Sequence, residues 1–155
     1  MCYFPYSVAY VEVVQAPATN TKADATYRLG LDANNYYRIY EEAGELFVQK
    51  RVAAGSKVTM WSAAYNAAHR YWRIRHEAAT GSVVFETAPD NAGVAGAWVE
   101  RYREAWNSGA IPVTSVVFEV KGGTWQAEAL AAGNVILTTS KPRNLDKASL
   151  FRWRF

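Results

Sequence analysis

Residues 69–87, HRYWRIRHEAATGSVVFET, carry the clearest strand pattern in the chain. This stretch holds two runs of alternating apolar and polar residues, joined by Ala-Ala-Thr-Gly. Because successive side chains of a strand point to opposite faces, Trp72 and Ile74 share one face and the charged residues between them lie on the other. Val83 and Phe85 can then oppose this apolar pair across the ladder. The stretch therefore predicts an antiparallel hairpin with one apolar face.

Short runs of the same kind recur along the chain, separated by clusters of Asn, Asp, Gly and Pro that are typical of turns. The runs are residues 7–15, 24–32, 36–41, 45–51, 57–61, 69–77, 82–87, 98–103, 113–121, 125–129 and 134–138. About ten short strands at a spacing of roughly 8–12 residues are typical of sandwiches and jelly rolls. We therefore expect an all-β fold with an antiparallel two-sheet sandwich, built by residues 1–140.

The segment 94–106 allows a second interpretation. Val94, Trp98, Tyr102 and Trp106 recur every four residues, which is the spacing of an apolar stripe on an amphipathic helix. The alternative to an all-β chain is therefore an α+β fold with one helix in this segment.

The charge of the chain is unevenly distributed. Its 155 residues carry a net charge of +3, but residues 141–155 alone carry +4 and the first 140 residues carry −1. We therefore treat 141–155 as a separate basic and aromatic tail, and we expect no nucleic-acid partner for the main domain. No apolar run reaches the ~18 residues of a membrane-spanning helix, and the first residues lack the basic region of a signal peptide. The chain as written is expected to be cytoplasmic, with no membrane partner.

Catalytic and metal-binding patterns are weak. A glycosidase needs two carboxyl groups converging on one face, and no strand run carries Glu or Asp two residues apart. Glu41 and Glu42 are adjacent, so we interpret them as solvated charges beside a turn. His69 and His76 are expected on opposite faces of one strand, and Asp90 with Asn91 offers too few oxygens for calcium. We expect no enzyme activity, no metal and no cofactor.

Aromatic residues are the candidates for ligand binding, because their rings can stack on sugar rings. We expect the binding face to lie on the side of the 69–77 strand that is opposite to the core, extended by the preceding segment. The nominated ligand-binding residues are Trp61, Tyr65, Tyr71, Arg73 and Arg75. The arginines have a second interpretation, as partners of Glu77 and Glu86 on an ordinary solvated face.

Four stretches of the chain resemble a known module: AYVEVVQAP, LGLDANNYYRIY, HRYWRIRHEAATGSVVFETAPDNAG and FEVKGGTWQAEA. They resemble the concanavalin A-like, laminin-G-like jelly-roll modules of bacterial secreted and surface proteins. The resemblance implies a non-catalytic binding module for carbohydrate or adhesion, derived from an extracellular or cell-surface ancestor. The alternatives are a self-association protein with no small-molecule ligand, and a small glycoside hydrolase that uses Glu86.

The chain departs from that pattern at both ends. Modules of this kind begin with further strands before the AYVEVV run, and they continue after Ile136 with a stretch like F-D-N-F. Deletion of one base converts codons for Ile-Phe-Asp-Asn-Phe-Lys into the residues 136–141 found here, so we hypothesise that the chain has changed reading frame after Ile136. In such folds the first and last strands are neighbours, so this change would leave a bare sheet edge. We therefore expect a homo-oligomer, through open edges or through exchange of terminal strands.

The last eight residues, ASLFRWRF, offer a replacement for the lost strand. Leu150, Arg152 and Arg154 alternate with Phe151, Trp153 and Phe155, which is the pattern of a strand. The other interpretation is a tail without fixed structure.

Overall fold

The hairpin of residues 69–87 forms the middle of one sheet in the computed structural model. The structure describes residues 9–14, 16, 23–124 and 151–154. Strands β6 (Tyr71–Glu77) and β7 (Ser82–Ala88) pair in antiparallel register, with Ile74 opposite Phe85. The first strand begins two residues later than expected, because residues 67–69 form the short 3-10 helix η2 (Ala67–His69). His69 is therefore not a strand residue. The expectation that His69 and His76 lie on opposite faces of one strand is wrong.

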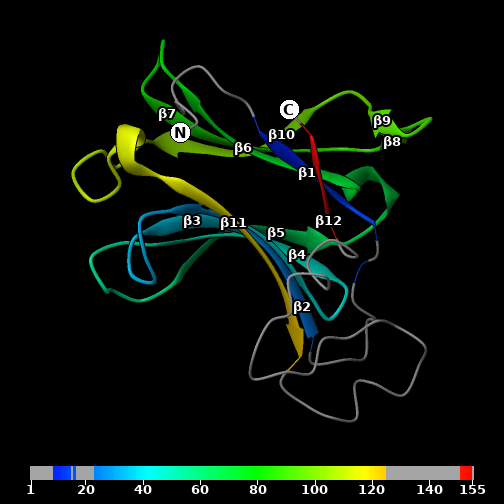
Figure 1. Cartoon of the computed structure of the whole chain (residues 1–155), viewed down its shortest axis with the longest axis horizontal. Coiled ribbons are helices and arrows are strands. Elements are labelled where there is room, and N and C mark those ends of the chain that lie inside the picture. The colour runs from blue at the N-terminus through cyan, green and yellow to red at the C-terminus, as the bar shows by residue number, and fades with distance from the viewer. Residues whose placement is uncertain (1–8, 15, 17–22, 125–150, 155) are drawn as a thin grey trace.

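Sheet A contains five strands in the order β10-β7-β6-β1-β12, and sheet B contains five in the order β11-β2-β3-β4-β5. All ladders are antiparallel, and the two sheets face each other as a sandwich (Figure 1). The all-β two-sheet prediction is confirmed. The remaining strands of sheet A are β1 (Tyr10–Val13), β10 (Val99–Ala105) and β12 (Phe151–Arg154). Those of sheet B are β2 (Ala23–Gly30), β3 (Tyr36–Glu42), β4 (Glu45–Arg51), β5 (Val58–Ala64) and β11 (Val117–Thr124).

Two smaller elements complete the described part of the chain. The ribbon of β8 (Asp90–Asn91) and β9 (Val94–Ala95) follows β7, and the 3-10 helix η3 (Val113–Ser115) precedes β11. Ala92 and Gly93, which join the ribbon, both have positive φ, as a two-residue type I′ hairpin requires. The expected runs 125–129 and 134–138 lie outside the described residues, as do most positions of the proposed change of frame.

The core lies between the sheets and contains the apolar face that the hairpin pattern predicts. Trp72, Ile74, Val83 and Phe85 are fully buried from sheet A. The side chains that meet them from sheet B include Tyr27, Leu29, Tyr37, Ile39 and Val48. Burial of large apolar and aromatic side chains is the main source of stability in such a sandwich.

The helix expected as an alternative for 94–106 is wrong, because the segment forms β9 and β10, and a β-bulge sends residues four positions apart to different faces. The ladder of β10 with β7 shifts its register between Glu100 and Tyr102. The extra residue changes which face later side chains take. Trp98 therefore packs beside Tyr10 on the outer face of sheet A, while Tyr102 packs toward the core beside Phe85.

The edge of β1 that we expected to be bare is paired. Strand β12 lies antiparallel beside β1, with Val11 opposite Trp153, so the end of the chain forms the outermost strand of sheet A (Figure 1). The strand interpretation of the last residues is thus the one that the structure shows. An oligomer cannot be argued from an open edge at β1.

Candidate functional site

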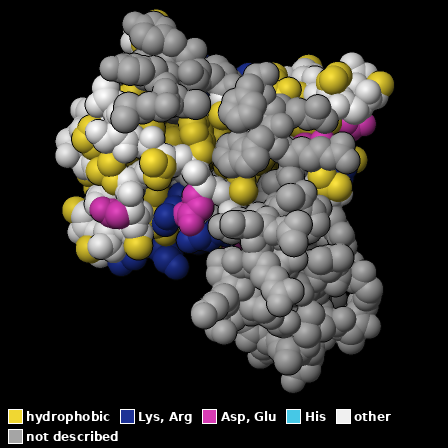
Figure 2. All heavy atoms as spheres, viewed as in Figure 1, with side chains coloured by type: hydrophobic (Ala, Val, Ile, Leu, Met, Phe, Trp, Pro, Cys, Tyr) yellow, Lys and Arg dark blue, Asp and Glu magenta, His cyan; other side chains and the backbone are white. Residues whose placement is uncertain are grey.

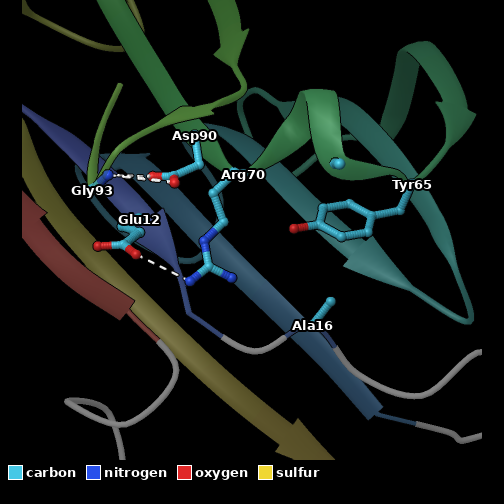
Figure 3. A pocket seen from close by; sticks show the side chains of 7 residues that line it. Glu12, Ala16, Tyr65, Arg70, Asp90 and Gly93 are labelled. Atoms are coloured by element: carbon cyan, nitrogen blue, oxygen red, sulfur yellow. Dashed lines mark hydrogen bonds and ion pairs between the residues drawn. The ribbon is translucent and has the colours of Figure 1, made fainter. Parts of the chain in front are cut away.

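A pocket with a volume of about 430 Å³ lies where three separate segments of the chain meet. Such a volume is within the usual range of small-ligand sites. The segments are β1 with the residues after it, the stretch from the end of β5 through η2, and the β8–β9 ribbon (Figure 3). The lining residues are Glu12, Ala16, Tyr65, Ala67, Arg70, Asp90 and Gly93.

Arg70 links two of these segments. Its Nη1 donates to the carbonyl of Val14 at 2.7 Å, and its Nη2 lies 3.0 Å from Oε1 of Glu12 (Figure 3). The amide of Val13 donates in turn to the carbonyl of Arg70 at 2.8 Å. Arg70 follows directly after η2, whose start is capped by Asn66 through its side chain and the amide of Ala68. These bonds hold the guanidinium and the Glu12 carboxylate together at the pocket wall.

Asp90 supplies a second carboxylate, held in its charged form. The Tyr71 hydroxyl donates to Oδ1 of Asp90 at 2.7 Å, and the amide of Gly93 donates to the same oxygen at 3.2 Å. The bond from Tyr71, helped by the Gly93 amide and the charge of Arg70, lowers the pKa of Asp90. An ionised carboxylate accepts hydrogen bonds only, so Asp90 is suited to bind hydroxyl or amine groups.

Tyr65 forms the aromatic wall of the pocket. Its amide donates to the carbonyl of Gly44 at 2.8 Å, and its ring packs edge-on to the buried Trp72. Burial raises the pKa of Tyr65 to about 12, so its hydroxyl remains protonated at neutral pH. Figure 3 shows this hydroxyl directed toward Arg70. The pocket thus combines one ring, two carboxylates and one guanidinium.

Of the five nominated residues, Tyr65 lines the pocket and Trp61 does not. Trp61 is partly buried against the core, edge-on to His69, with the guanidinium carbon of Arg101 at 5.7 Å from its ring centre. Tyr71 lies on the face of β6 opposite to the core, as expected, but other side chains cover it there and it is 0% exposed. Its ring lies edge-on to Tyr10, and its hydroxyl positions Asp90. Tyr71 therefore does not line the pocket but holds a residue that does.

Arg73 and Arg75 lie on the outer face of sheet A and are paired with acidic side chains. Both donate through Nε to Oε2 of the buried Glu86, at 2.6 and 3.0 Å. Arg75 also bonds Glu77, and the guanidinium carbon of Arg73 lies 4.1 Å from the ring centre of Trp98. This is the second interpretation of the arginines, as partners of Glu77 and Glu86. Basic side chains also lie beside acidic ones on the side of the sandwich that Figure 2 views.

Glu86 is poorly suited to act as a general acid. A general acid in glycoside hydrolysis must reach the glycosidic oxygen of its substrate. Glu86 is buried, and its Oε2 already accepts hydrogen bonds from both Arg73 and Arg75.

The interpretation of Glu41 as a solvated turn charge is wrong. Its side chain is fully buried on the inner face of sheet B, between Ala25 on β2 and Leu46 on β4. Oε1 accepts a bond from the Gly44 amide at 2.7 Å, and Oε2 has no hydrogen-bond partner among the described residues. Burial raises the pKa of Glu41 to about 7, against the effect of the Gly44 amide, and the negative charges of Asp24 and Glu42 raise it further.

Metal ligands do not converge in the described part of the chain, where no group of three or more His, Cys, Asp or Glu residues could hold an ion. His69 is buried beside Tyr65 and Trp61, and burial lowers its pKa, with help from the charge of Arg101. No described helix is long and apolar enough to cross a membrane.

Sequence reasoning missed Glu12, Arg70 and Gly93, and it considered Asp90 only for calcium. One signal was available for Glu12, since it lies between Val11 and Val13 and must point away from the core when they point into it.

Comparison of the chain with protein-family models, curated proteins and solved structures gives no match.

Proposed function

We propose that this chain is a non-catalytic binding module for carbohydrate, with the pocket of Tyr65, Glu12, Arg70 and Asp90 as its ligand site. The observation that carries the proposal is the convergence of these side chains in one open pocket from three parts of the chain. The resemblance to concanavalin A-like, laminin-G-like modules is compatible with such a role and implies an extracellular or cell-surface ancestor.

The chemistry of the pocket fits a polyhydroxylated ligand. Sugar hydroxyl groups can donate to the carboxylates of Asp90 and Glu12 and can accept from the guanidinium of Arg70. The ring of Tyr65 offers an apolar surface for the C–H face of a sugar. Because Asp90 is held ionised by Tyr71, it is better suited to accept hydrogen bonds than to deliver a proton in hydrolysis. This supports binding over glycosidase activity.

The proposal is tested by calorimetric titration with a panel of oligosaccharides at neutral pH. We expect the Asp90→Asn variant to bind the best ligand at least tenfold more weakly, a loss of about 1.4 kcal/mol. Asp90 is exposed, so this change should leave the fold intact. Tyr65→Phe keeps the ring and should lose less affinity than Tyr65→Ala.

Arg75→Gln is the matched control, since Arg75 lies on sheet A outside the pocket and Glu86 keeps its bond to Arg73. This variant should bind as the unchanged protein does. Failure of every oligosaccharide to bind, or loss of binding in Arg75→Gln but not in Asp90→Asn, would overturn the proposal.

A further inference from the structure

Strand β5 is an edge strand without charged residues. It is the last strand of sheet B, and among the described residues only β4 pairs with it. Its sequence, VTMWSAA, contains no charge, no proline and no glycine. Four of its seven residues are exposed, including Val58 at 47%. An unpaired edge of this kind presents free backbone N–H and C=O groups and readily accepts another strand.

The other sheet edges carry charges that discourage such pairing. Strand β10, the outer strand of sheet A, contains Glu100, Arg101, Arg103 and Glu104. Strand β11 contains Glu119 and Lys121, and the sequence of β12 contains two arginines. Charged side chains on edge strands are a common protection against pairing with other chains. Of the four outer strands of the two five-stranded sheets, β5 alone carries no charge, and its one irregularity is a register shift against β4 at Met60.

We propose that β5 pairs antiparallel with β5 of a second copy of this chain, so that the two B sheets join into one. Full overlap of the seven residues places Trp61 opposite itself on a two-fold axis, with Val58 opposite Ala64 of the other copy. A two-fold contact uses the same patch on both subunits, so the patch must tolerate its own copy. The sequence of β5 meets this condition, and the guanidinium of Arg101 beside the Trp61 ring is contributed by β10 of sheet A.

The nearest charged neighbour in sequence does not oppose this pairing. Lys57 precedes β5 directly and is exposed. In the register centred on Trp61, the two copies of Lys57 lie at opposite ends of the paired strands, so they do not repel each other at close range. A strand from another protein need not have the length of β5 or lack charge, whereas β5 of a second copy has both properties. We therefore assign the edge to a second copy.

The test is sedimentation equilibrium of the full chain from about 1 to about 100 µM, a range that covers micromolar self-association. A reducing buffer prevents covalent pairing through Cys2. We expect the unchanged protein to form a dimer and the double variant Thr59→Lys with Ser62→Lys to be monomeric at the same concentrations. Both positions are exposed, so the fold should tolerate the lysines. Val117→Lys on β11, the opposite edge of the same sheet, where Val117 is 59% exposed, is the matched control and should still dimerise.

A monomer throughout the range, or a dimer that the two lysines leave unchanged, would overturn the proposal. Hydrogen exchange of the unchanged protein gives an answer even if the double variant fails to fold. Amides of residues 58–64 should exchange more slowly as concentration rises, and exchange that does not depend on concentration would contradict the pairing.

Discussion

Replacing Glu41 with glutamine is expected to raise the free energy of unfolding at pH 8 by about 2 kcal/mol. The pKa of Glu41 is raised from 4.5 to about 7 in the folded chain, chiefly because burial penalises the charged form. A carboxyl whose pKa is higher in the folded state contributes stability that is fully present below its unfolded pKa. That contribution is lost as the pH rises through the folded pKa. The window for Glu41 therefore runs from about 4.5 to about 7.

Urea unfolding of both proteins at several pH values measures this effect. The gap between the Glu41→Gln variant and the unchanged protein should be small near pH 4.5 and should widen toward pH 8. His69 acts with the opposite sign, because its pKa is lowered and its stability contribution is lost as the pH falls. The comparison must therefore be made between variants at each pH. Glu42→Gln, on the neighbouring half-exposed residue, is the control. An equal gap at all pH values would contradict the buried, partly unpaired carboxyl.

Replacing Phe85 with alanine is expected to lower the free energy of unfolding by about 3–5 kcal/mol. Phe85 is fully buried on β7 of sheet A, edge-on to Tyr37 of sheet B and beside Tyr102 of β10. Loss of the ring leaves a cavity between the two sheets and removes contacts to both. Because the free energy of unfolding of small domains is only about 5–15 kcal/mol, this single change would remove a large part of it.

Chemical denaturation at pH 7 gives the comparison, with Val99→Ala as the control. Val99 lies in the same sheet but is 43% exposed, so its truncation should cost less than about 1 kcal/mol. Similar losses for the two variants would mean that Phe85 does not lie in a close-packed core.

The fold could be predicted from alternation within single strands. Trp72 and Ile74 point to one face and Arg73 and Arg75 to the other, as the period of two requires, and the core uses the first pair. Glu41 could have been placed by the same rule, because it continues the inward series of Tyr37 and Ile39. Glu41 was interpreted as a solvated charge beside a turn because it is charged, but its position on the strand determines that it is buried.

The site could be predicted only in part, because it depends on where loops cross the sheet. Tyr71 lies on the outer face of β6 as its parity requires, yet it is buried. Tyr10 and Trp98 pack on that face, whereas Tyr102, which follows the bulge in β10, packs toward the core. The β8–β9 turn brings Asp90 to Tyr71 over a separation of 19 residues. No local pattern in the sequence indicates the contact of Asp90 with Tyr71, so the pocket could not be predicted. Of the residues that line it, only Tyr65 was nominated from the sequence.

The location of the ligand site is tested most directly by nuclear magnetic resonance of the nitrogen-15-labelled chain, titrated with the oligosaccharide that binds most tightly. We expect the largest changes in amide chemical shift in the pocket, at Tyr65, Ala67, Arg70 and Gly93. Changes centred instead on Arg73 and Arg75, on the outer face of sheet A, would contradict this location of the site.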